Sequence, residues 1–195
     1  MTPITVAVEG PTDTVLARKL LDYTGLPLGH IYEAGGKSKL DLKLKGYNNA
    51  ARSAPWFVLR DLDQDEACAP ALASRLLKAP AKHMCLRIAV HQGESWLLAD
   101  AEQIAKFLKV QAVLVPGSPD ELVNAKQALV NLARASRSRD IQEALVPRSG
   151  STASVGRQYA SMIAEFIRSH WRPGIAAKRS ESLSRCIHAL RGFKI

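Results

Sequence analysis

Short apolar runs alternate with amphipathic stretches along the first half of the chain. The apolar runs, several of them rich in β-branched residues, cover residues 4–8, 30–32, 56–60 and 84–90. The stretches with apolar positions at helical spacing cover residues 13–24, 37–45, 70–77 and 94–108. Thr12 or Asp13 is expected to cap the first of these helices. Strands that alternate with helices are typical of a parallel sheet wrapped by helices. We therefore expect a Rossmann-like α/β core with a mainly parallel sheet over residues 1–110.

The pattern changes after residue 110, where the spacing of apolar positions favours helices. Helices are predicted near residues 120–135, 155–171 and 181–190, and residues 112–115 are the one further candidate strand. A polar loop near residues 148–152 separates the first two of these helices. We interpret residues 111–195 as a helical extension packed on the core.

Composition narrows the class of protein. The chain has 195 residues, 47% apolar and 23% charged, which is typical of a globular protein. It contains no run of 18 apolar residues, so no membrane-spanning helix is expected. Cys68, Cys85 and Cys186 are too scattered for a zinc site or a disulfide framework, and we expect buried free thiols. The first residues do not resemble a signal peptide, so a cytoplasmic location is expected.

Basic residues are concentrated near the end of the sequence. The formal net charge is +9, and residues 148–195 carry nine basic and only two acidic side chains. Such a charge suits a polyanionic partner such as nucleic acid, although a solvated basic face or a surface for an acidic protein would look the same. The arginines that we expect to follow a phosphate backbone are Arg157, Arg168, Arg179 and Arg185.

A second basic group follows Gly35 and Gly36. Lys37 and Lys39 lie where they could reach phosphate, or they belong to a solvated helix face. The segment resembles the end of a phosphate-binding loop, but that motif requires glycine at position 31, where this chain has Ile31. An NTPase is therefore not predicted.

Acidic residues follow three of the predicted strands. Glu9 follows the first, Asp61 and Asp63 follow the third, and Glu94 comes just after the fourth. The carboxyl ends of parallel strands lie along one edge of a sheet, so these acids are expected to converge there. Two carboxylates about 6 Å apart repel by roughly 3 kcal/mol at an effective dielectric constant of about 20, which favours recruitment of a cation. Oxygen ligands of this kind select Mg²⁺ or Mn²⁺.

Each acid also has a structural explanation when it is taken alone. The run from Asp61 to Glu66 would serve as a solvated loop with a helix cap, and Glu94 would favour the N-terminus of a helix. The run lacks the glycine that a calcium-binding loop needs at its sixth position. The joint placement of the acids at three strand ends is what favours a functional site.

These residues resemble the TOPRIM domain, which is shared by topoisomerases, bacterial primases, ribosomal-RNA maturases and OLD-family nucleases. The resemblance rests on Val8-Glu9-Gly10-Pro11-Thr12-Asp13 after one strand and on Asp61-Leu62-Asp63 at the end of a later one. The segment Glu94-Ser95-Trp96-Leu97-Leu98-Ala99-Asp100 is similar to one in small TOPRIM-like bacterial proteins associated with phage defence. The resemblance covers residues 1 to about 108 well and the helical extension more loosely.

The resemblance implies roles for individual residues. Glu9 would act as acid/base or metal ligand, and Asp61 with Asp63 would hold Mg²⁺. Glu94 matches a further acid of nuclease members, and Asp65 would be a peripheral or water-mediated ligand. The chain lacks the tyrosine nucleophile domain of topoisomerases and the partner modules of primases, so neither of those activities is expected.

The sequence thus leads to one principal hypothesis and one rival. The principal hypothesis is a Mg²⁺-dependent phosphodiesterase, a nuclease for DNA or RNA that acts in bacterial anti-phage defence, either alone or under the control of a partner ATPase. The rival is a non-catalytic module that keeps the fold and binds nucleic acid or a partner protein. Nothing in the sequence chooses between DNA and RNA.

Overall fold

The computed structural model describes residues 2–193 and contains a four-stranded, all-parallel sheet. The strands are β1 (Ile4–Val8), β2 (Leu28–Glu33), β3 (Trp56–Asp61) and β4 (Met84–Ala89), in the spatial order β2-β1-β3-β4. The expected parallel α/β core is confirmed, and the weak strand signal around His30 is part of β2.

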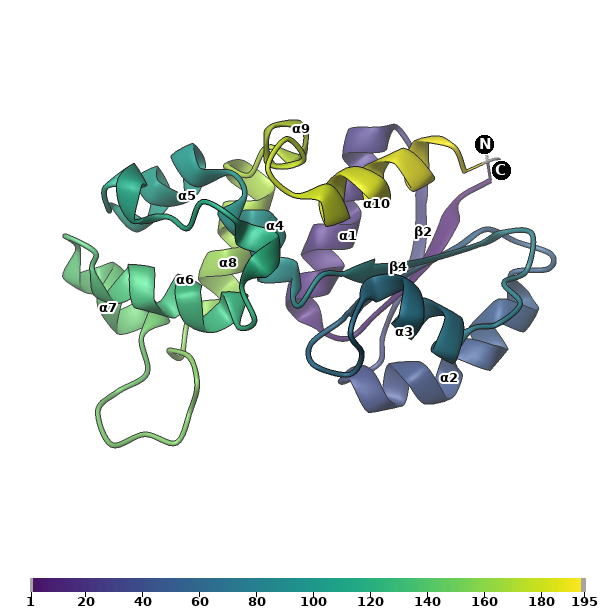
Figure 1. The fold of residues 1–195 in the computed structure, drawn as a ribbon, viewed down its shortest axis with the longest axis horizontal. Coiled ribbons are helices and arrows are strands. Elements are labelled where there is room, and N and C mark those ends of the chain that lie inside the picture. The colour runs from purple at the N-terminus through teal and green to yellow at the C-terminus, as the bar shows by residue number, and fades with distance from the viewer. Residues whose placement is uncertain (1, 194–195) are drawn as a thin grey trace.

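Helices cover both faces of the sheet (Figure 1). The helices that follow the first three strands are α1 (Pro11–Thr24), α2 (Lys37–Ala50) and α3 (Ala69–Leu76). On one face, Val6, Val8 and Phe57 are buried in the main core together with α1. On the other face, Ala7 and Val58 pack against α2, while Leu62 and Ile88 pack against α3. Alternate residues of each strand therefore serve opposite layers, as the pleat of a strand requires.

The second half of the described chain is helical. Its elements are α4 (Gly93–Leu98), α5 (Ala101–Leu108), η1 (Ala112–Leu114), η2 (Pro119–Glu121), α6 (Ala125–Arg134), α7 (Arg139–Leu145), α8 (Tyr159–Ser169), α9 (Pro173–Ala176) and α10 (Glu181–Arg191). The candidate strand at residues 112–115 is wrong, because Ala112–Leu114 forms one turn of 3-10 helix. α5 to α8 form a helical lobe beside the sheet, with α4 between the two (Figure 1).

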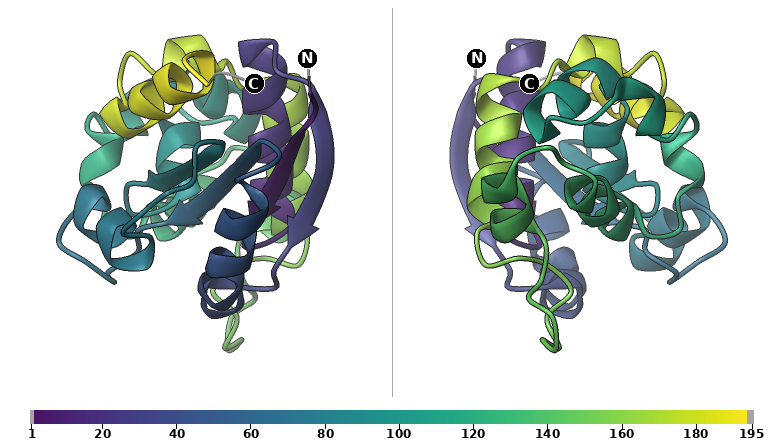
Figure 2. Two further views of the ribbon diagram at one scale, coloured as in Figure 1. Left: turned by 90° about the vertical axis from the view of Figure 1, so that its right-hand side faces the viewer. Right: turned by 90° about the vertical axis from the view of Figure 1, so that its left-hand side faces the viewer.

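One buried core joins the two halves of the chain. α8 and α10 both contact α1, and α10 also contacts β4, the edge strand. Figure 2 shows α10 lying over the sheet, beside α1, although it comes last in the sequence. Residue 110 therefore marks where the alternation of strands and helices ends along the sequence. It does not mark the end of the α/β core in space, because the final helix, α10, completes one of its layers.

Two helix boundaries differ from the sequence expectation. The first helix begins at Pro11 with Gly10 as its N-cap, so Thr12 and Asp13 lie inside the helix. The helix expected over residues 94–108 is two helices, because Asp100 caps the second one through a hydrogen bond from the Gln103 N–H at 3.5 Å. Asp100 is fully buried and its carboxylate also pairs with Arg172 at 2.7 Å.

Candidate functional site

The acids that follow the strands lie at the carboxyl edge of the sheet. Asp61 is the last residue of β3, which has β1 on one side and β4 on the other. Glu9 follows β1 directly, and Glu94 lies in the first turn of α4, just after β4. The three acids therefore come from three adjacent strand ends.

Backbone hydrogen bonds connect these strand ends to the acids. The backbone N–H of Asp61 donates to Oε1 of Glu9 at 3.0 Å, and the N–H of Gly93 donates to Oδ1 of Asp61 at 2.9 Å. A Cβ at position 93 would lie only 3.1 Å from a methyl group of Leu16. The start of α4 can therefore approach the end of β3 because residue 93 is glycine.

A fourth carboxylate, Asp13, joins this group. Its Oδ2 accepts a hydrogen bond from the Gly10 N–H at 3.1 Å, which places it in the first turn of α1. Oδ1 of Asp13 and Oδ1 of Asp61 both lie 3.8 Å from the position that a Cβ on Gly93 would occupy. We call Glu9, Asp13, Asp61 and Glu94 the inner acid cluster. The sequence pattern predicts only a capping role for Asp13, although its position four residues after Glu9 is a signal for the site.

Burial and mutual repulsion raise the pKa values in the inner acid cluster. Burial, then the charges of Asp13 and Glu94, raise the pKa of Asp61 well above its usual range. Burial, then the charges of Glu94 and Glu9, raise the pKa of Asp13 from 3.8 to about 7. Burial also raises the pKa of Glu9, against the opposing hydrogen bond from the Asp61 N–H. These carboxyl groups therefore favour a bound proton or an added cation.

The helical lobe supplies two partners to Glu94, which is only 5% exposed. Nζ of Lys126, at the start of α6, lies 3.5 Å from Oε1 of Glu94. The Tyr159 hydroxyl, at the start of α8, donates to the same oxygen at 3.1 Å. The charge of Glu94 is the main cause of a raised pKa at Lys126. Neither partner was predicted, because each lies more than 30 residues from Glu94 and carries no local motif.

Asp63 and Asp65 lie in a separate ion-pair network. Nζ of Lys37 is 2.8 Å from Oδ2 of Asp63 and 3.0 Å from Oδ1 of Asp65. Arg60, only 2% exposed, pairs with Asp65 at 2.5 Å and with Asp41 at 3.0 Å. The hydrogen bond from Arg60 is the main cause of a lowered pKa at Asp65. We call Lys37, Arg60, Asp63 and Asp65 the outer ion-pair network. Lys37, expected to reach phosphate, is held here by carboxylates.

The carboxylate oxygens of the inner acid cluster are the type of ligand that a hard divalent cation prefers. Their arrangement in this structure does not form a coordination site. Among residues 2–193, no group of three or more His, Cys, Asp and Glu side chains is arranged to hold a metal ion. The chemistry of the donors nevertheless fits Mg²⁺ or Mn²⁺, because the four groups are carboxylates and only two cations, Lys126 and Arg60, lie within 4 Å of them among the described residues. Binding would therefore require rearrangement of these side chains.

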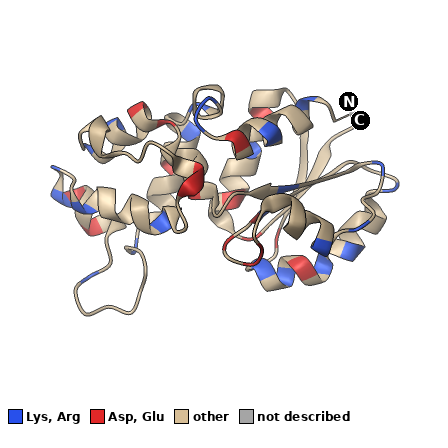
Figure 3. Ribbon diagram, in the orientation of Figure 1, with Lys and Arg blue, Asp and Glu red and all other residues tan. Residues whose placement is uncertain are grey.

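The basic residues expected to follow a phosphate backbone are spread over different elements (Figure 3). Arg157 and Arg168 are exposed beside and on α8, and Arg185 is exposed on α10, where it pairs with Glu181 at 2.5 Å. The Arg179 guanidinium donates to the carbonyl oxygens of residues 99, 116 and 117, at 2.9 to 3.3 Å, so it anchors a loop. Lys39 is exposed on α2.

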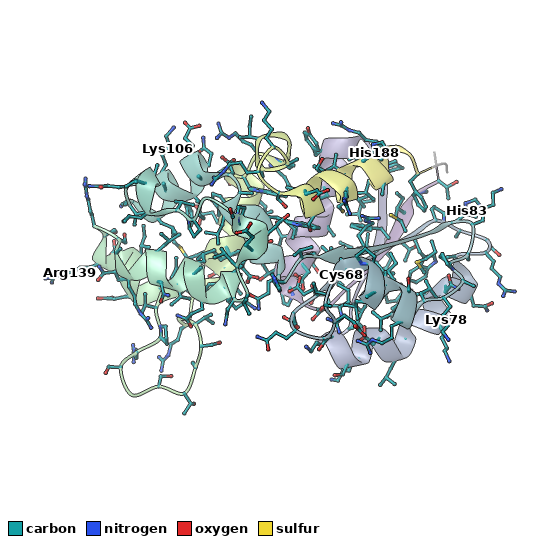
Figure 4. The ribbon with its side chains drawn as sticks, in the orientation of Figure 1. Cys68, Lys78, His83, Lys106, Arg139 and His188 are labelled. Atoms are coloured by element: carbon teal, nitrogen blue, oxygen red, sulfur yellow. The ribbon has the colours of Figure 1, made fainter. Side chains whose placement is uncertain are left out.

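A cavity of about 880 Å³ lies between α3 and α10, beside the acidic edge. Cys68 lines one side and His188 the other (Figure 4), and Arg87 lies on the β4 side. The Arg87 Nε is buried and has no hydrogen-bond partner among the described residues. Cys68 is exposed, so the expectation of three buried thiols is wrong at that position and right for Cys85 and Cys186.

No helix within residues 2–193 is long and apolar enough to cross a membrane. Comparison of the chain with protein family models, with curated proteins and with solved structures finds no match in any of the three.

Proposed function

We propose that this protein is a TOPRIM-like, Mg²⁺- or Mn²⁺-dependent phosphodiesterase that cleaves nucleic acid. The observation that carries the proposal is the inner acid cluster: four carboxylates from three strand ends and one helix start, with Lys126 beside Glu94 and Arg60 beside Glu9. Such a group is costly for the folded state unless a proton or a cation relieves the repulsion. Charge concentrated in this way, at the ligand-binding edge of an α/β sheet, favours a functional origin over a structural one.

Within this proposal, Asp13, Asp61 and Glu94 would hold the cation. A bound Mg²⁺ supplies positive charge that polarises the phosphoryl group under attack. The Gly93 N–H fixes one oxygen of Asp61, and Lys126 and the Tyr159 hydroxyl fix one oxygen of Glu94. Each of these carboxylates thus has an oriented oxygen and a second oxygen available for a ligand.

Glu9 is placed to move a proton. The Asp61 N–H orients its Oε1, its side chain is 17% exposed, and its pKa is raised by burial. A carboxyl group with a raised pKa exchanges protons more readily near neutral pH than an ordinary glutamate does. Arg60, whose Nε lies 3.8 Å from Oε1, restrains the same side chain from the other side.

The test is a cleavage assay with Mg²⁺ and with Mn²⁺ on single-stranded DNA, duplex DNA and RNA. Glu9→Gln should abolish cleavage with a melting temperature no lower than that of the parent, because the amide cannot exchange the proton but keeps the size of the side chain. Glu33→Gln is the matched control, since Glu33 ends β2 on the same sheet edge but lies outside the cluster. Cleavage that survives Glu9→Gln, or equal activity in EDTA, would exclude the proposed mechanism.

A non-catalytic binding module is the second candidate. It is favoured by the outer ion-pair network, in which Lys37 and Arg60 already neutralise Asp63 and Asp65 without a metal. In that case nucleic acid would bind with the same affinity in EDTA and in Mg²⁺, and neither metal would produce cleavage products. The same assay therefore separates the two candidates.

A further inference from the structure

An aromatic stack lies on the face of the sheet that carries α2. Tyr32 of β2 stacks on Trp56 of β3, with centroids 5.7 Å apart and planes 10° apart. Tyr47 of α2 stacks on Trp56 at 4.9 Å and lies 6.2 Å from Tyr32. His30, two residues before Tyr32 on β2, contacts the Tyr32 ring edge-on at 4.4 Å. Residues from two strands and a helix thus form one aromatic surface, which we call the aromatic platform.

The platform is buried at its base and open at its outer ring. Trp56 is 8% exposed, whereas Tyr32 is 45% exposed. α2 packs against β3 and leaves β2 largely uncovered, since four of the six residues of β2 are exposed. A rigid ring that is fixed on one face and free on the other can stack against a further flat ring.

Lysines border the platform on α2. Leu40, Leu44 and Tyr47 form the face of α2 that packs on the sheet. Lys39 and Lys43 precede Leu40 and Leu44, which places the two lysines together on one flank of that face. The Lys39 side chain lies near the end of β2, with Nζ 3.7 Å from a Cβ position on Gly35.

The flank with Lys39 and Lys43 is free to bind an anion. Both lysines are exposed, and neither forms an ion pair with any acid within residues 2–193. The blue segments along α2 in Figure 3 show this basic helix. Asp41, the acid within α2, is held by Arg60 on the opposite flank, toward β3.

We propose that the aromatic platform binds single-stranded nucleic acid, with a base stacked on Tyr32 and the phosphates beside Lys39 and Lys43. Exposed aromatic rings next to a line of cations are the chemistry by which proteins bind single strands without sequence preference. A duplex cannot use this surface, because the faces of its bases are already stacked on one another. The charge of the flank selects a polyanion over an apolar or cationic partner.

The platform also leads toward the inner acid cluster. Tyr32 pairs with Ala7 in the sheet, and Glu9 lies two residues further along the chain. A strand rises about 3.3 Å per residue, so Glu9 is about 7 Å beyond the level of Tyr32. The platform thereby names single-stranded nucleic acid as the substrate class of the proposed function. This assignment of the substrate rests on that function. Binding itself does not depend on cleavage.

The experiment is fluorescence anisotropy in EDTA with labelled oligo(dT) and oligo(U) of about 15 nucleotides and with a duplex of equal length. We expect both single strands to bind more tightly than the duplex. Tyr32→Ala should weaken binding about 5- to 150-fold, the range given by the loss of one base–aromatic stack. Tyr32→Phe should bind like the parent because the ring remains. Tyr23→Ala is the matched control, since Tyr23 of α1 is 41% exposed.

The charge component is tested separately, in a variant that leaves the aromatic rings intact. Lys39→Gln combined with Lys43→Gln should flatten the log–log salt dependence of single-strand binding by about 1.4, or about 0.7 for each lost phosphate contact. Both side chains are exposed, so this variant should fold like the parent, and its melting temperature checks that it does.

Three results would overturn the inference. They are equal single-strand affinities for Tyr32→Ala and the parent, a preference for duplex, and an unchanged salt slope in the lysine variant. A change of oligomeric state in Tyr32→Ala without a change in binding would instead assign the platform to contact with a second copy of the chain. Binding that follows these predictions in a protein without nuclease activity would support the platform and refute only the proposed function.

Discussion

Removal of one charge from the inner acid cluster should stabilise the protein when no metal is present, and Asp13→Asn is the most direct form of that change. Burial and the charges of Glu94 and Glu9 raise the pKa of Asp13 from 3.8 to about 7. Above pH 7, where Asp13 is ionised, this shift corresponds to a destabilisation of the folded state by about 4 kcal/mol. Asparagine keeps the shape of the side chain and an oxygen that accepts from the Gly10 N–H. Recovery of only half of this free energy, about 2 kcal/mol, would raise the Tm by about 4–8 °C.

The pH dependence has a definite sign. The folded chain protonates Asp13 below about pH 7, whereas the unfolded chain does so only near its ordinary pKa of 3.8. The parent therefore gains stability as the pH falls through 7, and this gain is complete near pH 4. Asp13→Asn should be more stable than the parent near pH 8 and close to it near pH 5. Glu9 and Asp61 also have raised pKa values, so a weaker dependence of the same sign should remain in the variant.

The assay is thermal unfolding in EDTA, followed by circular dichroism between about pH 5 and pH 8. Asp22→Asn is the control, because Asp22 lies on the same helix but is exposed and outside the inner acid cluster. A lower Tm for Asp13→Asn than for the parent near pH 8 would refute the repulsion on which the site is built. A parent protein whose Tm falls as the pH is lowered from about 8 to 6 would also refute this repulsion.

Three further predictions address the metal and the packing around the site. Millimolar Mg²⁺ or Mn²⁺ should raise the parent's Tm by mass action and EDTA should reverse the effect; unchanged melting curves would count against a metal site. Ser182→Ala should lower the free energy of unfolding by about 2–4 kcal/mol in urea titrations, because its hydroxyl accepts from the Val90 N–H at 3.0 Å and the Trp96 indole at 2.8 Å. Gly156→Ala should lower the Tm strongly, because the new Cβ would lie 2.3 Å from a backbone oxygen. Gly46→Ala, in open space within α2, should stabilise by about 0.5–1 kcal/mol, and equal melting of the two variants would contradict this contrast.

Local patterns in the sequence were sufficient to predict the strands and the class of fold. Strand formation depends on side chains within a few residues, so the apolar runs before Glu9 and Asp61 predicted where two strands end. The parallel direction of the strands followed from the alternation of strands and helices, because such elements pack together in only a few ways. The placement of Glu9 beside Asp61 was predictable for that reason, since it needed only the direction of neighbouring strands.

Tertiary structure alone decided which charges meet. Lys126 and Tyr159 reach Glu94 from helices later in the chain, and Arg60, 3.8 Å from Glu9, pairs more closely with Asp65 and Asp41. The same holds for the break between α4 and α5, where Asp100 binds Arg172 from 72 residues away. Contacts of this kind depend on the packing of whole helices, which no window of neighbouring residues encodes. The sequence therefore determined the edge of the sheet at which the acids gather, and the packing of the helical lobe determined how their charges are balanced there.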